Sequence, residues 1–256
     1  MLPIAIKAAR AAGEIITSHL EAGLVEVYEK HEGETYTNCD VLCEKKIREI
    51  IGKKFSDHNF LGEECGRSGD KSEYLWIIDP IDGTNNFVAK IPFFAVCIAL
   101  AVRGELAASV IFNPVTDELF TSEKGKGAFL NGAPMSVSCV KNVEHALIGF
   151  NAGKKGEGAV FLNAFAHIQP RAKRVRILGA SALELAYTAA GKIDGFISTH
   201  SHLWDYAAAV LLVREAGGSV LNLEGEQWGF RDASLVAAPS DLAAALLKLS
   251  LQKVIL

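Results

Sequence analysis

Residues 74–87 read YLWIIDPIDGTNNF, an apolar run that ends in two carboxylates. Leu75 to Ile78 is expected to form a buried strand. Pro80 has no N–H to donate to a neighbouring strand, so the backbone should turn immediately after Asp79. Asp82 returns three residues later, close enough to share a ligand with Asp79. Strand ends in layered α/β folds project side chains into crevices, and the pattern therefore predicts a binding site here.

The residues after Asp82 have little side-chain bulk. Gly83 would let a bulky anion approach the backbone, and the N–H groups from Gly83 onward can point at that anion. Asp-Gly pairs also form ordinary turns. A turn alone does not explain two aspartates, a proline, a glycine and Thr84 at the end of a fully apolar strand. We therefore interpret the segment as a site that accepts an anion.

Acidic residues elsewhere follow the same pattern. Glu63 and Glu64 end a short strand at residues 59–61, and Asp205 stands at the start of an apolar helix, where it would also serve as an N-cap. Two unit charges about 4 Å apart repel by roughly 4 kcal/mol at an effective dielectric near 20, so converging carboxylates need cations or protons. Oxygen ligands without Cys or His favour Mg²⁺ or Mn²⁺ over zinc. These acids are predicted to hold metal.

The remainder of the chain alternates between helical and strand-like patterns. Helices are expected over residues 3–20, 39–55, 159–168, 181–190, 205–216 and from about 240, and strands over 59–61, 75–78, 91–102, 106–112, 118–122, 127–130, 146–150, 174–178, 195–198 and 219–223. Helices that alternate with strands pack on sheet faces, so the pattern predicts a layered α/β sandwich. We place a boundary near residue 140, between an N-terminal half (1–140) that carries most metal ligands and a C-terminal half (141–256) that contributes Asp205 and substrate-side residues.

Composition narrows the class of protein. The 256 residues are 50% hydrophobic and carry a formal net charge of −4, which predicts a substantial core and argues against a general nucleic-acid binder. Lys7, Arg10 and Glu14 interrupt the N-terminal apolar stretch, so neither a signal peptide nor a membrane span is expected. A cytoplasmic protein is the simple interpretation. The five cysteines include no CxxC pair, which predicts reduced and mostly buried thiols.

Three segments resemble the inositol monophosphatase family of Mg²⁺-dependent, lithium-sensitive phosphatases. These segments are Gly62–Glu64, Asp79–Thr84, and Trp204-Asp205 followed by Glu215–Gly218. Their order and spacing fit the family, and the resemblance covers essentially the full chain. It implies an αβαβα sandwich, usually a homodimer, that hydrolyses a small phosphorylated polyol or sugar.

The resemblance also implies a set of metal ligands. One ion would be held by Glu63, Asp79 and the backbone carbonyl of Ile81. A second would lie between Asp79, Asp82 and Asp205, and a third, weaker ion would use Glu63 and water. The family therefore suggests two to three Mg²⁺ ions in this chain.

Further residues acquire catalytic roles by the same resemblance. Asp40 matches the family acid that hydrogen-bonds the motif threonine, here Thr84. Glu63 and the Thr84–Asp40 pair would orient a metal-activated water and accept its proton, for in-line attack without a covalent intermediate. The N–H groups of Gly83 and Thr84 would stabilise the phosphoryl oxygens.

The alcohol half of the substrate is left open by the sequence. By the resemblance, Gly179, Ala180 and Ser181 match a family segment that lines the sugar or inositol side of the substrate. The residues expected to bind the phosphate side are Asp82, Gly83, Thr84 and Asp205. Ser198 stands seven residues before Asp205, where inositol-hydrolysing members often carry a glutamate. Glu34 replaces the family's early aspartate if Lys30 is the matching lysine.

Other residues help to choose among relatives. Asn85 fits inositol monophosphatases and dual-specificity enzymes that also hydrolyse fructose 1,6-bisphosphate, whereas phosphatases of 3′-phosphoadenosine 5′-phosphate usually have a lysine there. Basic residues within 173–179 could meet a second phosphate, or could simply be solvated strand ends. Inositol monophosphate and fructose 1,6-bisphosphate both remain candidate substrates.

Two other functions are disfavoured by the sequence. His200 and His202 could form a two-histidine metal site, but loop histidines near a polar cleft are the commoner arrangement. A catalytically silent binding protein would be expected to lack one of the acids or the threonine described above, and none is missing. We expect a small-molecule substrate and a homodimer, with no nucleic-acid or membrane partner.

Overall fold

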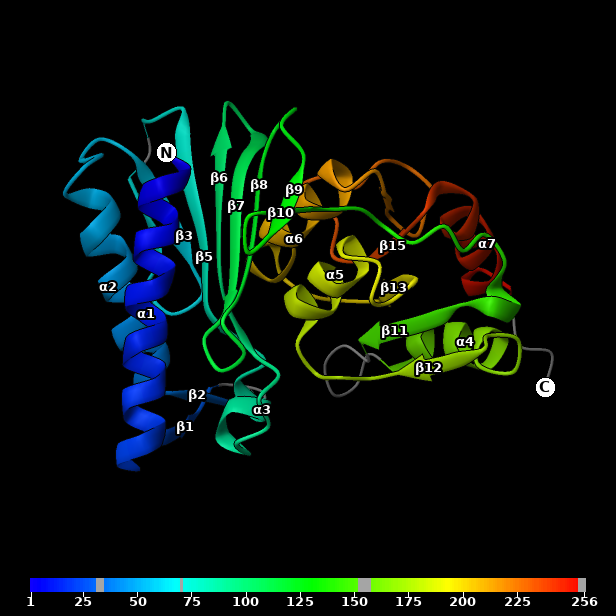
Figure 1. Ribbon diagram of the computed structural model, residues 1–256, viewed down its shortest axis with the longest axis horizontal. Coiled ribbons are helices and arrows are strands. Elements are labelled where there is room, and N and C mark those ends of the chain that lie inside the picture. Colours follow the sequence, from blue (N-terminus) through cyan, green and yellow to red (C-terminus); the bar gives the residue numbers. More distant parts are fainter. Residues whose placement is uncertain (31–34, 70, 152–157, 253–256) are drawn as a thin grey trace.

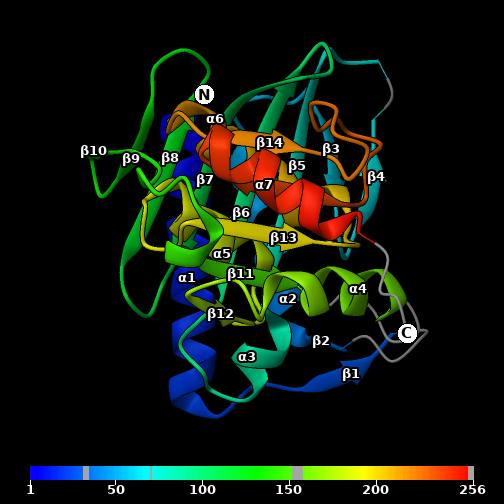
Figure 2. The same ribbon diagram turned by 90° about the vertical axis from the view of Figure 1, so that its right-hand side faces the viewer.

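Five layers follow one another along the long axis of the molecule in the computed structural model, which describes residues 1–30, 35–69, 71–151 and 158–252 (Figure 1). The outer helices α1 (Leu2–Ala22) and α2 (Asn38–Gly52) cover an eight-stranded sheet. The middle helices α5 (Ser181–Ala189) and α6 (Leu203–Glu215) separate it from a five-stranded sheet. The helices α4 (Gly158–Ile168) and α7 (Ser240–Ser250) cover the far face of that second sheet (Figure 2). The architecture is the expected αβαβα sandwich.

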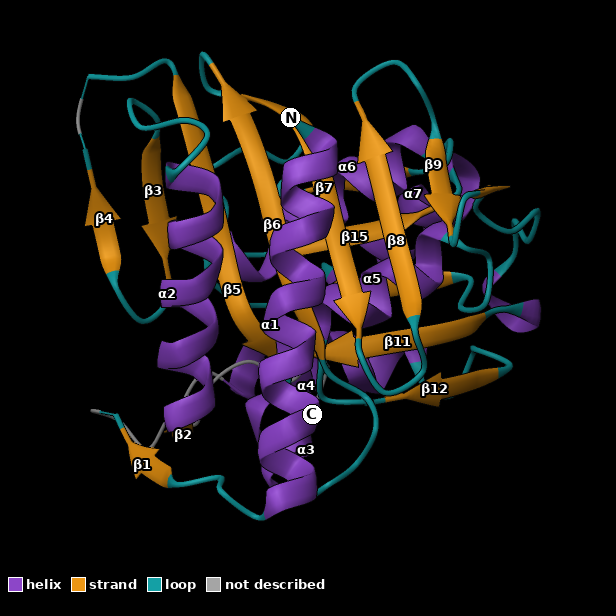
Figure 3. Ribbon diagram, turned by 60° about the vertical axis from the view of Figure 1, so that its left-hand side comes forward, coloured by secondary structure: helices purple, strands orange, loops and turns teal. Residues whose placement is uncertain are grey.

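The eight-stranded sheet has the order β10-β9-β8-β7-β6-β5-β3-β4. Its strands are β3 (Asn59–Gly62), β4 (Gly66–Ser68), β5 (Tyr74–Asp82), β6 (Ala95–Val102), β7 (Glu105–Asn113), β8 (Glu118–Glu123), β9 (Ala128–Leu130) and β10 (Ala133–Met135). Neighbouring strands are antiparallel except β3 and β5, which are parallel and lie side by side (Figure 3). The C-terminal ends of β3 and β5 therefore meet at one edge of the sheet.

The second sheet has the order β12-β11-β13-β15-β14. Its strands are β11 (Leu147–Asn151), β12 (Arg174–Arg176), β13 (Gly195–Ser198), β14 (Ser219–Leu221) and β15 (Leu235–Ala238). Two smaller features complete the fold near the first sheet: the hairpin of β1 (Val27–Glu29) and β2 (Thr35–Thr37), and the short helix α3 (Thr84–Val88). A single 3₁₀ turn, Val143–His145, precedes β11.

The middle helical layer explains how the two sheets join. Every residue of α6 from Tyr206 to Val213 is buried, because the helix is covered by a sheet on each side. Its apolar residues and those of α5 form one core cluster with the inner faces of both sheets. A second cluster lies under α1 and α2, and a third under α4 and α7. The acidic N-terminal turn of α6 is thereby held against the first sheet.

Most expected elements are present, but several bounds differ. The prediction that the backbone turns away directly after Asp79 is wrong, since β5 continues to Asp82. Asp79 pairs with Cys97 and Asp82 pairs with Ala95, with an irregularity in register between them. Pro80 occupies this bulge, where a missing N–H breaks no ladder bond. The strand expected from residue 91 begins only at Ala95.

Other expectations need smaller corrections. The strands expected to end at residues 178 and 223 end at Arg176 and Leu221. Strands β1, β2, β4, β10 and β15 and helix α3 were not expected from the sequence. Three cysteines are buried, but Cys65 and Cys139 are exposed. The boundary near residue 140 stays a prediction. Among the described residues, no helix combines the length and apolarity needed to cross a bilayer.

Candidate functional site

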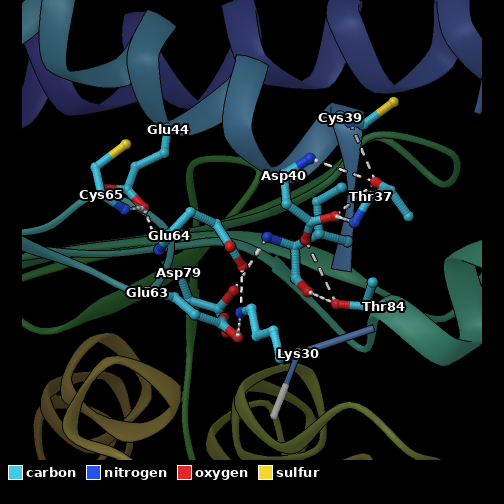
Figure 4. Close-up of polar contacts among 11 residues, drawn as sticks. Lys30, Thr37, Cys39, Asp40, Glu44, Glu63, Glu64, Cys65, Asp79 and Thr84 are labelled. Atoms are coloured by element: carbon cyan, nitrogen blue, oxygen red, sulfur yellow. Dashed lines mark hydrogen bonds and ion pairs between the residues drawn. The ribbon is translucent and has the colours of Figure 1, made fainter. Parts of the chain in front are cut away.

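Three acidic side chains converge where β3 and β5 end beside the start of α6. Glu63, Asp79 and Asp205 each offer one carboxylate oxygen, and these oxygens all lie within 4.8 Å of one another. The parallel register of β3 and β5 pairs Gly62 with Ile78, so that Glu63 and Asp79 follow at equivalent positions. Figure 4 shows their side chains beside one another. The sequence prediction that distant acids meet in one place is therefore met for these three residues.

Asp79 is almost completely buried at the bulge of β5. Its Oδ1 accepts a hydrogen bond from the N–H of Ile81 at 3.0 Å, which fixes the carboxylate within the bulge. Burial raises the pKa of Asp79 well above its ordinary value, and the charges of Glu63, Asp82 and Asp205 raise it further. The carboxylate therefore favours a proton or a cation as its partner.

Asp82 links the first sheet to the middle helices. It is buried, and its Oδ2 accepts a hydrogen bond from the N–H of Leu183 in the first turn of α5 at 3.0 Å. Burial raises the pKa of Asp82 to about 8, against the opposing effect of the backbone N–H groups of α5. The negative charge of Asp205 raises it as well. Asp82 lies next to the three converging oxygens and is not itself one of that group.

Asp205 occupies the third position of α6, and the expectation that it is the N-cap is wrong. The N-cap residue is His202, whose backbone N–H donates to Oδ2 of Asp205 at 2.7 Å. The hydroxyl of Ser201 also contacts this oxygen. Capping from the third position works because an N3 carboxylate can reach back to the N-cap N–H. The side chain therefore starts the helix and reaches the acidic cluster at the same time.

Lys30 brings a positive charge to the cluster. Its Nζ lies 2.9 Å from Oε1 of Glu63 and 2.5 Å from Oε1 of Glu64 (Figure 4). Burial lowers the pKa of Lys30, but the two carboxylates outweigh this effect and the pKa is raised overall. The lysine thus stays charged and offsets part of the acidic charge. Glu34, the expected replacement for a family aspartate, lies outside the described residues.

Thr84 and Asp40 lie together, as the sequence predicts. Oγ1 of Thr84 lies 3.0 Å from the carbonyl oxygen of Ile81 and 3.4 Å from Oδ1 of Asp40. Asp40 is buried and accepts a hydrogen bond from the N–H of Thr37 at 2.8 Å. Burial raises the pKa of Asp40 to about 7, against the hydrogen bonds from Thr37. The predicted roles of Ile81 as a metal ligand and of Asp40 as a proton relay stay predictions.

Gly83 lies against the segment expected to bind the substrate's alcohol. Its φ is +87°, and an added Cβ would lie 2.8 Å from Cβ of Ala180 and 3.2 Å from the carbonyl oxygen of Gly179. A side chain at this position would therefore push the two segments apart. Asn86 also links the segment after β5 to the segment at Gly179, since its Nδ2 donates to the carbonyl oxygen of Leu178 at 2.7 Å. The glycine is required by backbone packing, whether or not an anion binds.

The other predicted substrate-side residues lie nearby. Ser181 accepts a hydrogen bond from Nδ2 of Asn151 at 2.7 Å, at the C-terminal end of β11. Ser198 is fully buried and pairs with Asn151 across the two parallel strands. His202 stacks on Trp204 with ring centroids 4.6 Å apart, and within the described chain no metal-ligand group includes either His200 or His202.

Glu44 shapes the turn that carries Glu63, and the sequence analysis missed it. Its buried carboxylate accepts hydrogen bonds from the N–H groups of Glu64 at 2.7 Å and Cys65 at 3.2 Å, and pairs with Arg48 at 2.7 Å. A Cβ on Gly62 would lie 2.0 Å from Oε1 of Glu44, so this strand end and the carboxylate are in direct contact. The i,i+4 spacing of Glu44 and Arg48 predicts an ion pair but not the contact with the turn.

Glu184 plays a similar part for the segment at Gly179. It is 1% exposed, and its Oε1 accepts hydrogen bonds from the N–H groups of Leu178 at 3.1 Å and Gly179 at 3.2 Å. Its Oε2 is buried without a hydrogen-bond partner among the described residues. Burial raises the pKa of Glu184 to about 8. A lone acid in the apolar stretch SALELAYTA was the signal that could have identified it.

The donor set fits a hard divalent cation. The cluster offers carboxylate oxygens from two strand ends and one helix start, and Lys30 is the cation that contacts it among the described residues. Carboxylates at this spacing repel one another, and Mg²⁺ is bound through such oxygens together with substrate phosphates. The arrangement can therefore hold a metal and an anion side by side.

The substitution Glu44→Gln should destabilise the protein by about 2–4 kcal/mol, because the neutral amide no longer balances the charge of Arg48 and its NH2 group must face either Arg48 or the backbone N–H donors. Urea unfolding in the presence of a chelator measures the loss. Glu49→Gln, on an exposed face of the same helix, should leave stability nearly unchanged. Equal stability of the Glu44→Gln variant and the native chain would contradict the role given to Glu44.

Stability should also depend on the protonation of Glu184. The pKa of Glu184 is raised to about 8 in the folded chain, so the folded state holds its proton more tightly than the unfolded state. The contribution of Glu184 to the free energy of unfolding is therefore complete below about pH 4.5 and is lost as the pH rises toward 8. Relative to Glu184→Gln, the native chain should lose at most about 1.4 kcal/mol of unfolding free energy per pH unit over this window. Chelator-treated samples unfolded in urea at pH 5 to 9 test this. A difference independent of pH would count against a buried titrating Glu184.

Comparison with known proteins is consistent with this geometry. The sequence profile of the inositol monophosphatase family matches residues 1–254. The Nus factor SuhB of Pseudomonas aeruginosa is 39% identical over 255 residues, which cover 96% of this chain and 94% of the relative. The inositol-1-monophosphatase of Mesorhizobium japonicum is 38% identical over 252 residues, with coverage of 97% and 95%.

A solved structure extends the similarity to three dimensions. The crystal structure of the extragenic suppressor protein SuhB from Bartonella henselae has a TM-score of 0.95 at 34% identity and covers 99% of both chains. Profile, sequence identity and fold agree over nearly the whole length. The chain belongs to the inositol monophosphatase family.

Proposed function

We propose that this chain is a Mg²⁺-dependent phosphatase that hydrolyses inositol monophosphate to inositol and phosphate. The observation that carries the proposal is the convergence of Glu63, Asp79 and Asp205 within 4.8 Å, next to the buried Asp82. Family membership supports phosphatase chemistry. The choice of substrate is supported by the similar protein from Mesorhizobium japonicum, which is named an inositol-1-monophosphatase.

The acidic residues would divide the binding work between them. Glu63, Asp79 and the carbonyl of Ile81 would hold one Mg²⁺, and Asp79, Asp82 and Asp205 a second, with Mn²⁺ as an alternative ion. When bound, these ions would supply the positive charge that lowers the pKa of a water nucleophile and offsets the charge of the phosphate. The buried acids have raised pKa values, which is consistent with a need for such charge.

The remaining residues would position the water and the phosphate. Thr84 can accept a hydrogen bond from a water while it donates to Asp40, and Asp40 can take up a proton because its pKa lies near neutrality. The N–H groups of Gly83 and Thr84 at the start of α3 would donate to the phosphoryl oxygens. Direct attack by water on phosphorus needs no covalent intermediate.

Two alternative functions have specific support. The basic segment 173–179 favours a dual-specificity enzyme that also hydrolyses fructose 1,6-bisphosphate, with the basic residues near a second phosphate, and Asn85 is compatible with this alternative. Relatives named Nus factor SuhB favour the role of a Nus factor, either besides catalysis or in its place. The expectations of a cytoplasmic homodimer, of lithium sensitivity and of no nucleic-acid partner stay predictions.

Replacing Asp79 by asparagine tests the metal site. The variant Asp79→Asn should lose turnover by a factor of at least about a thousand, since one ligand shared by both ions is gone. Circular dichroism should show an intact fold, because the amide keeps the shape and the acceptor for the Ile81 N–H. The exposed control Asp117→Asn should keep full activity. Near-native turnover in Asp79→Asn would refute the metal assignment.

A substrate panel tests the alcohol half. The kcat/KM for inositol 1-phosphate should exceed that for fructose 1,6-bisphosphate and for 3′-phosphoadenosine 5′-phosphate, and excess chelator should abolish all three activities. Comparable values for the first two would establish the dual-specificity alternative. A preference for the adenylate would reject both. Absence of hydrolysis for every ester with Mg²⁺ present would favour the non-catalytic role.

A further inference from the structure

A cavity separate from the acidic cluster lies at the C-terminal end of α6, whereas Asp205 lies at the N-terminal end. Arg214 follows Asp205 by nine residues, so the two lie roughly 13 Å apart along the helix. The cavity has a volume of about 390 Å³ and is bounded by the turns that follow β6, β8 and β14. Figure 2 shows α6 and β14 together near the top of the molecule. Its apolar walls come from Leu106, Leu211, Trp228 and Phe230.

Arg214 is the unusual member of this lining. Its Nη2 donates to the carbonyl oxygen of Trp228 at 2.6 Å, while its Nε is buried with no hydrogen-bond partner in the described part of the chain. Burial lowers the pKa of Arg214, and no charged group in the described ranges offsets this effect. A partly buried cation without a counterion is unfavourable, and removing that imbalance would stabilise the folded chain.

The acidic residues that line the cavity are bound elsewhere. Glu215 accepts hydrogen bonds from the N–H groups of Gly125 and Gly127, both at 2.8 Å. Glu105 forms an ion pair with Lys124 at 2.6 Å. Neither carboxylate therefore neutralises the guanidinium of Arg214. The cavity combines an unpaired cation with apolar and aromatic walls.

We propose that this cavity binds a small organic carboxylate with a flat apolar body. A guanidinium matches a carboxylate through paired N–H donors, and this match is stronger when the pair is shielded from water. Phe230, which is partly exposed, offers an aromatic surface for the flat body of the ligand, and the buried Trp228 lies behind it in the cavity wall. The volume lies within the range of small-molecule sites. The site is separate from the acidic cluster and does not rest on the proposed phosphatase activity.

The first test measures binding directly. Fluorine NMR of 4-fluorobenzoate, titrated against the full chain in a chelating buffer, should show saturable binding. The neutral 4-fluorobenzamide has nearly the same shape and should bind at least about tenfold more weakly. Equal affinity for the two probes would overturn the proposal, as would the lack of saturable binding up to about 10 mM benzoate.

Variants then locate the site. Arg214→Met should weaken benzoate binding by about tenfold or more, whereas Arg171→Met, which removes the same charge from an exposed arginine outside the cavity lining, should leave it unchanged. If Arg214→Met does not fold, Phe230→Ala removes one wall of the cavity and should also weaken binding. Unchanged binding in the Arg214 or Phe230 variant would refute the site. Loss of binding in Asp79→Asn would assign the probe to the acidic cluster instead, and would equally refute it.

Discussion

Repulsion between closely spaced carboxylates, two of them buried and two partly buried, is the constraint on which the site depends. Asp79 and Asp82 lie on one strand, Glu63 follows the parallel strand beside it, and Asp205 approaches from the middle helical layer. An apolar core would be more stable without them, since taking charges out of water is expensive. The fold holds them together through the pairing of β3 with β5 and the burial of α6 between two sheets. The pKa values of Asp79 and Asp82 are raised, which means that these two buried carboxylates favour a proton or a cation as a partner.

Backbone N–H groups, more than side chains, keep the acids in place. Asp82 accepts from the first turn of α5, Asp205 accepts from the start of α6, and Asp79 accepts from its own bulge. These donors are fixed by secondary structure, so each carboxylate is oriented without a second charge that would compete for the metal. Glu44 and Glu184 make the same kind of interaction around the site, because the carboxylate of each accepts hydrogen bonds from two successive backbone N–H groups of a segment that borders the site. The site is thus surrounded by acids with different tasks.

Some parts of this arrangement can be predicted from the sequence and others cannot, for physical reasons. Strong periodicity and the spacing of acids reveal the layers, the cluster at Asp79 and the pairing of Asp40 with Thr84. The bulge at Pro80 was not predictable, because a proline ends a strand in one context and is accommodated by a bulge in another. Glu44 was missed because its role arises from contacts with the N–H groups of Glu64 and Cys65, which lie far from it in the sequence. Glu184 contacts the nearby Leu178 and Gly179, but the backbone turn that brings their N–H groups to its carboxylate has no period that the sequence could show. Short edge strands such as β4 and β10 have too few residues to show a period.

Arg214 and the acidic cluster illustrate one principle with opposite signs. At one end of α6, the negative charges of the acidic cluster exceed the nearby positive charge, and at the other end the guanidinium of Arg214 lacks a counterion among the described residues. The buried, apolar middle of the helix, from Tyr206 to Val213, separates the two ends. A ligand of opposite charge stabilises whichever end it occupies, and the rigid helix between them is packed against both sheets. Occupation of one end can therefore influence the other through the position of α6 and through the electrostatic field across its buried middle, because charges roughly 13 Å apart that are partly shielded from water are screened less than exposed ones.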